Sequence, residues 1–262
     1  MKKNEQVNTD NVSRQRELQL ASVPEGMEPW VLGQLVREIA VDADNQPGVI
    51  VHVARDDRRL AQLEAGLGFF APDVRVLSFP AWDTVPYDRI GPNSEIVARR
   101  IATLAKLSVG RRKIPTVVLT TVNAILQRVP PQDFLRASLK QIAPGQRIDM
   151  NRLLARLQLA GFTRTGTVME PGEYAVRGAI LDLFPPGRSM PVRLDFFGDT
   201  LESIKSFDPQ TQRTTKSVQK VVLMPIVEVA LGEEATSRFR RRYVELFGGG
   251  HGVDPLYEAV SA

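Results

Sequence analysis

The chain has no cysteine among its 262 residues, and His52 and His251 are its only histidines. The absence of cysteine excludes disulfide bonds and cysteine-ligated metals, and two histidines are too few for a typical zinc site. No apolar run approaches the roughly 20 residues that a membrane-spanning helix needs. The stretch 1–23 is polar and lacks the apolar centre of a signal peptide. We therefore expect a cytoplasmic protein with no metal and no membrane partner.

The chain does contain enough apolar sequence for a packed fold. Hydrophobic residues make up 43% and charged residues 24% of it, and its length allows one large or two small domains. The net charge of +4 is too small to indicate nucleic-acid binding by itself. Pro130-Pro131 predicts a domain boundary. The expected organisation is a flexible tail at 1–24, an α/β domain at 25–130, an α+β domain at 131–220 that is inserted into or follows the first, and a C-terminal segment at 221–262.

The first domain alternates between strand and helix patterns. Short valine-rich runs predict buried parallel strands at 48–53, 74–79 and 116–121, because strands covered on both faces are apolar throughout. Around them, apolar residues recur at helical spacing. The expected helices lie at 30–40, from Asp56-Asp57 to Gly68, from Asn93 or Ser94 to Leu107, and at 122–127. This alternation predicts a doubly wound parallel sheet.

Doubly wound sheets often bind nucleotides through a glycine-rich loop after the first strand, and this chain lacks that loop. Residues 53–60 read VARDDRRL. No glycine exposes backbone N–H groups there, no Lys-Ser or Lys-Thr follows, and Asp56 and Asp57 would repel a phosphate. We therefore expect no nucleotide hydrolysis and no cofactor in this chain.

Two further groups of charged residues have plain structural explanations. Asp83 and Asp88 lie in an aromatic-rich loop without a histidine or metal ligand beside them, so the loop is interpreted as an anchor against the sheet and not as a catalytic site. Arg99-Arg100 and residues 111–113 are basic clusters. They are interpreted as solvated helix ends, with a weak DNA contact as the alternative.

The second domain begins with a strand pattern at 139–142 and a helix that Asp149 caps and Gly161 ends. From Thr163 to Met224, turn residues separate short β-forming runs, which predicts a meander of antiparallel strands. Beyond it, the charged run 233–247 predicts a helix, and a last short helix is expected from residue 254 onward.

One strand of this meander, 192–197, has two different faces. Its even-numbered residues are apolar and point toward a core, so Arg193, Asp195 and Phe197 point the other way. That second face is either an ordinary solvated surface or a docking surface, since arginine and aromatic residues are enriched at binding hot spots. Asp195 is spaced to orient Arg193 for an incoming carboxylate. Arg177 is expected on a neighbouring strand of the same face.

Six runs of the sequence belong together: 172–185 (GEYAVRGAILDLFP), 193–197 (RLDFF), 207–214 (FDPQTQRT), 81–89 (AWDTVPYDR), 94–100 (SEIVARR) and 130–134 (PPQDF). They resemble the N-terminal module of the bacterial transcription-repair coupling factors (Mfd), a module that is itself similar to the N-terminal part of the excision-repair helicase UvrB. The resemblance extends from Met27 to Leu231. It implies a helicase-like first domain that has lost its nucleotide site, and a C-terminal segment from Val221 that packs back on that domain.

The resemblance also implies a function. The full-length factors are ATP-driven DNA translocases whose motor domains use ATP and magnesium, and they remove stalled RNA polymerase and recruit UvrA for nucleotide excision repair. By the resemblance, this chain is a non-catalytic adaptor that binds UvrA, while RNA polymerase and DNA contact other domains. Arg177, Arg193 and Phe197 match residues of the family's UvrA-binding surface, and Asp195 lies among them. In the family a distal C-terminal domain masks this surface, which is expected to be open in this chain.

The alternative, from another class, is a UvrB-type DNA-binding helicase fragment that acts directly on damaged DNA. It would require a continuous basic groove, stacking aromatic residues or a DNA-clamping hairpin. The sequence contains no long aromatic-rich hairpin between the strands near Val76 and Val117. This absence favours the adaptor.

Overall fold

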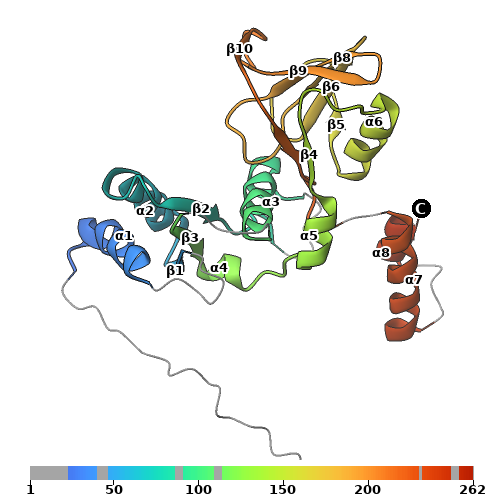
Figure 1. The fold of residues 1–262 in the computed structure, drawn as a ribbon. Helices are drawn as coiled ribbons and strands as arrows, with labels where there is room; N and C mark the ends of the chain where they lie inside the picture. Colours follow the sequence, from blue (N-terminus) through green and yellow to red (C-terminus); the bar gives the residue numbers. More distant parts are fainter. Residues whose placement is uncertain are drawn as a thin grey trace, which may run out of the picture.

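The structure, a computed structural model, describes residues 23–39, 47–85, 91–108, 114–229, 232–248 and 254–261. The tail expected at 1–24 lies outside these residues except for its last two, and so do Asp88 and the basic cluster 111–113. The described chain forms two units that each contain a sheet, followed by a pair of helices (Figure 1).

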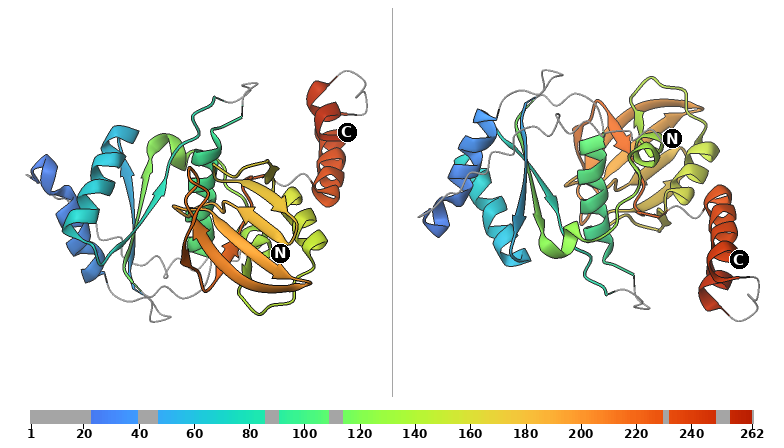
Figure 2. Two further views of the ribbon diagram at one scale, coloured as in Figure 1. Left: turned by 90° about the horizontal axis from the view of Figure 1, so that it is seen from above. Right: turned by 90° about the horizontal axis from the view of Figure 1, so that it is seen from below.

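The first unit is built on a three-stranded parallel sheet in the order β1-β3-β2. Its strands are β1 (Val49–Ala54), β2 (Arg75–Phe79) and β3 (Thr116–Thr121). Helices α1 (Glu28–Glu38) and α2 (Asp57–Phe70) cover one face, and α3 (Ser94–Ser108) lies on the other (Figure 2). The short helix η1 (Glu25–Met27) precedes α1, and α4 (Val122–Ile125) follows β3. Helices on both faces of a parallel sheet agree with the expected α/β class, while the finer helicase-like assignment stays a prediction.

The start of α2 shows how the sequence fixes these elements. The carboxylate of Asp56 accepts a hydrogen bond from the backbone N–H of Arg59 at 2.7 Å. This bond satisfies one of the donors that the first turn of a helix leaves unpaired. The apolar residues that follow at helical spacing, Leu60, Leu63 and Leu67, are all buried and pack in the same core as β3.

The second unit carries the expected antiparallel meander. Six strands form a sheet in the order β10-β9-β8-β7-β6-β5. They are β5 (Thr163–Arg164), β6 (Glu173–Arg177), β7 (Ile180–Leu183), β8 (Val192–Phe197), β9 (Thr200–Phe207) and β10 (Thr214–Ser217). All neighbouring strands are antiparallel except β5 and β6. Gly178 and Gly198 turn two of the hairpins with φ of 62° and 56°, which glycine adopts without steric cost.

One face of this sheet forms the core of the second unit. Helix α6 (Met150–Leu159) packs there, and Asp149 caps it by accepting a hydrogen bond from the backbone N–H of Arg152 at 3.0 Å. The largest cluster of buried residues consists of Ile142, Ile148, Leu153, Leu157, Phe162, Tyr174, Leu181, Leu183, Val192, Leu194, Phe196, Leu201, Ile204, Val221 and Leu223. The even-numbered residues of β8 are in this core, as its alternating pattern predicts.

The last strand of the second unit is β11 (Val221–Leu223), which pairs with β4 (Lys140–Ile142). The sequence analysis extended the meander to Met224 but placed the domain boundary at 220, before these residues. The structure keeps them in its core, because they pair with a strand far away in the sequence, and local patterning does not show such a pairing. Helix α5 (Gln132–Ser138) leads from the first unit into β4.

After β11 the chain returns to the first unit. Glu228 forms an ion pair with Arg100 of α3, with Nε–Oε1 at 2.5 Å and Nη2–Oε2 at 3.1 Å. The two side chains are 0% (Arg100) and 6% (Glu228) exposed. The second unit therefore lies between two segments that both contact the first unit, which corresponds to an insertion. The sequence analysis expected a solvated Arg100, and this is wrong. Arg100 lies three residues after Val97 and four before Leu104, on the side of α3 that faces the core.

The two units also touch where the turn after β7 meets α3. Gly187 in this turn has a φ of +72°, and a Cβ added to it would lie 2.5 Å from the Cβ of Ala102. Real Cβ atoms do not approach one another so closely, so either the turn or the helix would have to move. Glycine is therefore required at this position for two independent reasons, backbone conformation and close packing.

Replacing Gly187 by alanine is expected to lower the free energy of unfolding by about 2–4 kcal/mol, the sum of a left-handed backbone conformation and overpacking. Gly198→Ala is the matched control. Gly198 also has a positive φ, but an added Cβ would meet nothing within 4 Å. Urea denaturation of both variants measures the difference. Equal losses would show that the contact between the units is loose.

Helices α7 (Glu233–Phe247) and α8 (Pro255–Ser261) pack on each other and lie apart from the first unit (Figure 1). Phe239, Tyr243, Phe247 and Tyr257 form an aromatic cluster with ring centroids 4.8 to 6.2 Å apart. The hydroxyl of Tyr243 donates a hydrogen bond to Asp254. Packing of this pair on the first unit, which the family resemblance implies, stays a prediction.

Candidate docking face

The six-stranded sheet has a second face, turned away from the core, which we call the docking face. It is made by Arg177 of β6, Ile180 and Asp182 of β7, and Arg193, Asp195 and Phe197 of β8. Residues directly paired across antiparallel strands point to the same side of a sheet. One row of pairs runs Ala175–Asp182–Arg193–Lys205, and the next runs Arg177–Ile180–Asp195–Ser203. The register thus places Arg177, Arg193 and Asp195 on one face.

Arg177 is further from β8 than the sequence analysis expected. Strand β7 lies between β6 and β8, so Arg177 is two strands away from Asp195, a distance of roughly 10 Å at normal strand spacing. Its side chain is exposed, and its Nη2 donates a hydrogen bond to the backbone carbonyl of Gly166 at 2.9 Å. Arg177 therefore presents its positive charge at the open edge of the docking face.

Asp182, and not Asp195, holds Arg193. The Nε of Arg193 donates to Oδ1 of Asp182 at 2.7 Å, and Nη2 donates to Oδ2 at 2.9 Å. The carboxylate is 1% exposed and the guanidinium side chain 21% exposed. The orienting role predicted for Asp195 is therefore wrong, because Asp182 is the direct cross-strand partner of Arg193 whereas Asp195 lies two residues along the same strand.

Further contacts fix the plane of the Arg193 guanidinium. Its Cζ lies 4.9 Å from the centroid of the Phe207 ring, and its Nη1 donates to the backbone carbonyl of Gln212 at 3.4 Å. The loop that carries Gln212 is held by Asp208, which accepts hydrogen bonds from Thr211 that lower the pKa of its carboxyl group. The hydrogen bonds to Asp182 raise the pKa of Arg193 above its ordinary value. This shift adds to the stability of the positive charge that arginine carries in proteins.

Phe197 is the most exposed large apolar side chain of the docking face. It lies at the end of β8, next to the Gly198 turn, and is 76% exposed. At the opposite end the face is closed by a small buried cluster, formed by Val168, Ala175, Phe184 and Phe207. One half of the face is therefore packed, while the half with Arg177, Asp195 and Phe197 is open.

The sequence analysis missed Asp182, Phe207 and Gln212 as parts of this face. The strand pattern contained a signal for Asp182, because it lies between Leu181 and Leu183 of β7 and so points away from the core. Pattern alone could not identify its partner. Gln212 carried no signal, since its non-glycine backbone with a φ of 58° is a property of the folded loop.

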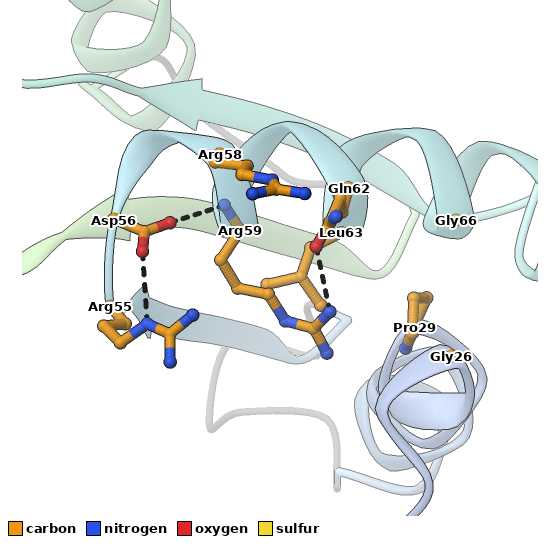
Figure 3. A pocket seen from close by; sticks show the side chains of 9 residues that line it. All are labelled: Gly26, Pro29, Arg55, Asp56, Arg58, Arg59, Gln62, Leu63 and Gly66. Carbon is orange, nitrogen blue, oxygen red and sulfur yellow. Dashed lines mark hydrogen bonds and ion pairs between the residues drawn. The ribbon is translucent and has the colours of Figure 1, made fainter.

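The first unit has a depression of about 590 Å³ at the end of β1, where a phosphate loop would lie (Figure 3). Of its three arginines, Arg55 and Arg59 are engaged by neighbouring side chains. Arg55 donates to Asp56 at 3.1 Å, and Arg59 donates to Gln62 at 3.1 Å and pairs with Glu28 at 2.7 Å. The carboxylate of Asp56 occupies the start of α2, where a bound phosphate would otherwise accept backbone hydrogen bonds.

Other kinds of site were sought in the same part of the chain. Among the described residues, no group of three or more acidic or histidine side chains could hold a metal ion. No described helix is long and apolar enough to cross a membrane.

Comparison with known proteins identifies one part of the chain. Residues 141–228 match the family described as the UvrB interaction domain. This range includes the whole docking face and ends at Glu228, the residue that pairs with Arg100. The chain is 36% identical over 227 residues to the transcription-repair-coupling factor of Escherichia coli K12, covering 87% of this chain and 19% of that protein. The chain corresponds to a module of the transcription-repair-coupling factors and matches about a fifth of their length.

Two further relatives show the range of sequence identity to these factors. The factor of Myxococcus xanthus is 40% identical over 197 residues, with 72% of this chain and 16% of the relative covered. The factor of Mycobacterium bovis is 31% identical over 209 residues, with 77% and 17% covered. The chain spans about a fifth or less of the length of the curated relatives it matches. The family resemblance found in the sequence is confirmed.

Proposed function

We propose that this chain is a non-catalytic adaptor whose docking face binds UvrA. The observation that carries the proposal is the half-open face itself, where a buried carboxylate fixes Arg193 and the same strand ends in an exposed Phe197. Ordered arginine and aromatic side chains on a rigid sheet are the features of protein-binding hot spots. The match of residues 141–228 to the UvrB interaction domain supports the choice of partner.

In the proposed contact, four residues of the docking face bind different groups of the partner. Arg177 and Arg193 offer cations to carboxylates of the partner, and Phe197 enters an apolar pocket. Asp195 is partly exposed and forms no ion pair with another described residue, so it contacts a polar or basic group at the rim. A partner surface that is acidic, with an apolar hollow, fits this face.

The wider role is proposed from the family. In a full-length factor this module recruits UvrA to stalled RNA polymerase in transcription-coupled nucleotide excision repair. Other domains contact RNA polymerase and DNA and use ATP with magnesium to translocate, and a distal C-terminal domain masks the docking face until it is needed. The protein acts in the cytoplasm.

Calorimetric titration of the purified chain with UvrA tests the proposal directly. Saturable binding with 1:1 stoichiometry per docking face is expected. The same titration is made with duplex and single-stranded DNA at two salt concentrations. Binding to DNA that weakens with salt, together with no binding to UvrA, would replace the adaptor by the DNA-binding alternative.

The purified chain is also expected to show no ATP hydrolysis, with or without DNA. After β1 the chain has Asp56 at the start of α2 and no glycine-rich loop. The backbone N–H groups that would bind the phosphates of ATP are therefore not available. A coupled phosphate-release assay measures turnover. Activity that survives further purification and disappears on substitution of residues 54–59 would contradict this expectation.

A further inference from the structure

Asp182 occupies an unusual place for a carboxylate. It lies in the second half of β7, 1% exposed, between Ala175 of β6 and Arg193 of β8 in one cross-strand row. A buried carboxylate is costly unless it is paired and hydrogen-bonded. Both oxygens of Asp182 are used by a single partner, Arg193.

These two bonds leave part of the Arg193 guanidinium available. The group has five N–H donors. The bonds to Asp182 use Nε and one hydrogen of Nη2, which form the side edge of the guanidinium, and a long bond to Gln212 uses one hydrogen of Nη1. One hydrogen on Nη1 and one on Nη2 remain. A guanidinium can present Nη1 and Nη2 together as an end edge for a second carboxylate.

We infer that Asp182 is the positioning residue of the docking face, which holds the side edge of Arg193 so that its end edge meets a carboxylate of the partner. The inference rests on the proposed docking function and specifies its geometry. Asp182 is too buried to touch a partner itself. Its role is to remove the rotational freedom of a long side chain before binding, which lowers the entropic cost of the contact.

Asp195 has a different part in this arrangement. Its cross-strand partners are Ile180 and Ser203, and within the described residues no hydrogen bond or ion pair joins it to Arg193. If Asp195 contributes to binding, it does so independently of Arg193. The two carboxylates are therefore distinguished by whether their effects depend on the presence of Arg193.

A double-mutant cycle with UvrA as the probe makes this distinction. Asp182→Asn is expected to weaken UvrA binding about tenfold in the wild-type chain, but to change it by less than about twofold in the Arg193→Ala background, because a residue that acts through another has no effect once that other is gone. Asp195→Asn is the matched control, and its effect should be the same in both backgrounds. Equal weakening by Asp182→Asn in both backgrounds, or no weakening in either, would overturn the inference.

A second measurement separates this inference from the proposed function. In the ¹⁵N-labelled chain, the Nε–H of Arg193 should give a resolved NMR signal protected from solvent exchange, because it is donated to Asp182. The signal is assigned by its loss in Arg193→Lys. It should persist in Asp195→Asn and disappear in Asp182→Asn. Loss in Asp195→Asn would overturn the positioning role of Asp182, whereas an intact signal in a chain that does not bind UvrA would overturn only the docking function.

Discussion

Replacing Glu228 by glutamine is expected to lower the free energy of unfolding by about 3–5 kcal/mol, because it leaves the Arg100 guanidinium buried without a counter-charge. The contacts of Arg100 account for this sensitivity. Its Nη1 donates to the backbone carbonyl of Pro80 at 2.8 Å and to Oε1 of Gln127 at 2.9 Å. Glu228 supplies the only carboxylate bonded to Arg100 among the described residues, and it also accepts a hydrogen bond from the indole of Trp82 at 3.0 Å.

The matched control is Glu95→Gln on the same helix. Glu95 pairs with Arg99 at 3.2 Å, but both side chains are at least half exposed, so its loss should cost only a few tenths of a kcal/mol. Urea denaturation of the two variants gives the comparison. A double variant, Arg100→Met with Glu228→Met, should recover most of the stability, because it removes both charges together. A small effect of Glu228→Gln would show that water reaches the pair.

This ion pair also bears on the docking function. Arg100 belongs to the first unit, and Glu228 follows the last strand of the second. Phe79 and Trp82 pack on the guanidinium, with ring centroids 4.2 and 5.0 Å from its Cζ. The hydrogen bonds and ring contacts around Arg100 and Glu228 together hold the two units in one orientation. The docking face is thereby presented in a fixed direction relative to the first unit.

The helices and strands could be predicted from sequence where their signals are local. The cap at Asp56 and the apolar spacing of α2 are examples, and so is the alternation of β8. The contacts that decide the site are not local. Asp182 meets Arg193 only because of the register between β7 and β8, and Arg100 meets Glu228 across 128 positions of sequence. Spacing along the chain therefore suggested Asp195 as the partner of Arg193, although the folded sheet provides a closer one.

Arg99-Arg100 illustrates the same limit. As a pair in the sequence they looked like one basic cluster. On the helix, Arg99 faces outward to Glu95, while Arg100 turns toward Pro80 and Glu228. The helical pattern held a clue, since Arg100 lies three residues after Val97 and four before Leu104, on the apolar side of α3. An arginine in such a stripe indicates a buried partner, but not which one.

The largest effects on binding are expected at the docking face. Phe197→Ala should weaken UvrA binding by about 2–4 kcal/mol, since a central aromatic anchor is usually the costliest residue to truncate. Because Phe197 is 76% exposed, the melting temperature should change little. Phe69→Ala is the matched control, as Phe69 is 78% exposed on the first unit and should not affect binding. Unchanged binding in Phe197→Ala would place the partner surface elsewhere.

The two arginines should respond differently from each other. Arg177→Ala should weaken UvrA binding by about 1–2 kcal/mol without loss of stability, because Arg177 is exposed and donates only to a backbone carbonyl. Arg193→Ala should weaken binding by about 2–4 kcal/mol and also destabilise the fold, because it leaves Asp182 buried and unpaired. The variant Arg193→Ala with Asp182→Asn restores the balance of charge. It should melt above Arg193→Ala alone while binding no better.

Arg193→Lys tests whether the contact of Arg193 with UvrA depends only on its positive charge or also on the planar guanidinium group. An ammonium group keeps the positive charge near Asp182, but it cannot bond both oxygens of that carboxylate and at the same time present a planar edge to a second one. Binding should therefore fall nearly as far as in Arg193→Ala, by about 1–3 kcal/mol, while stability is largely kept. UvrA affinity and thermal melting are measured side by side, with Arg152→Lys on the exposed surface of α6 as the control. Full binding by Arg193→Lys would reduce the role of Arg193 to its charge alone.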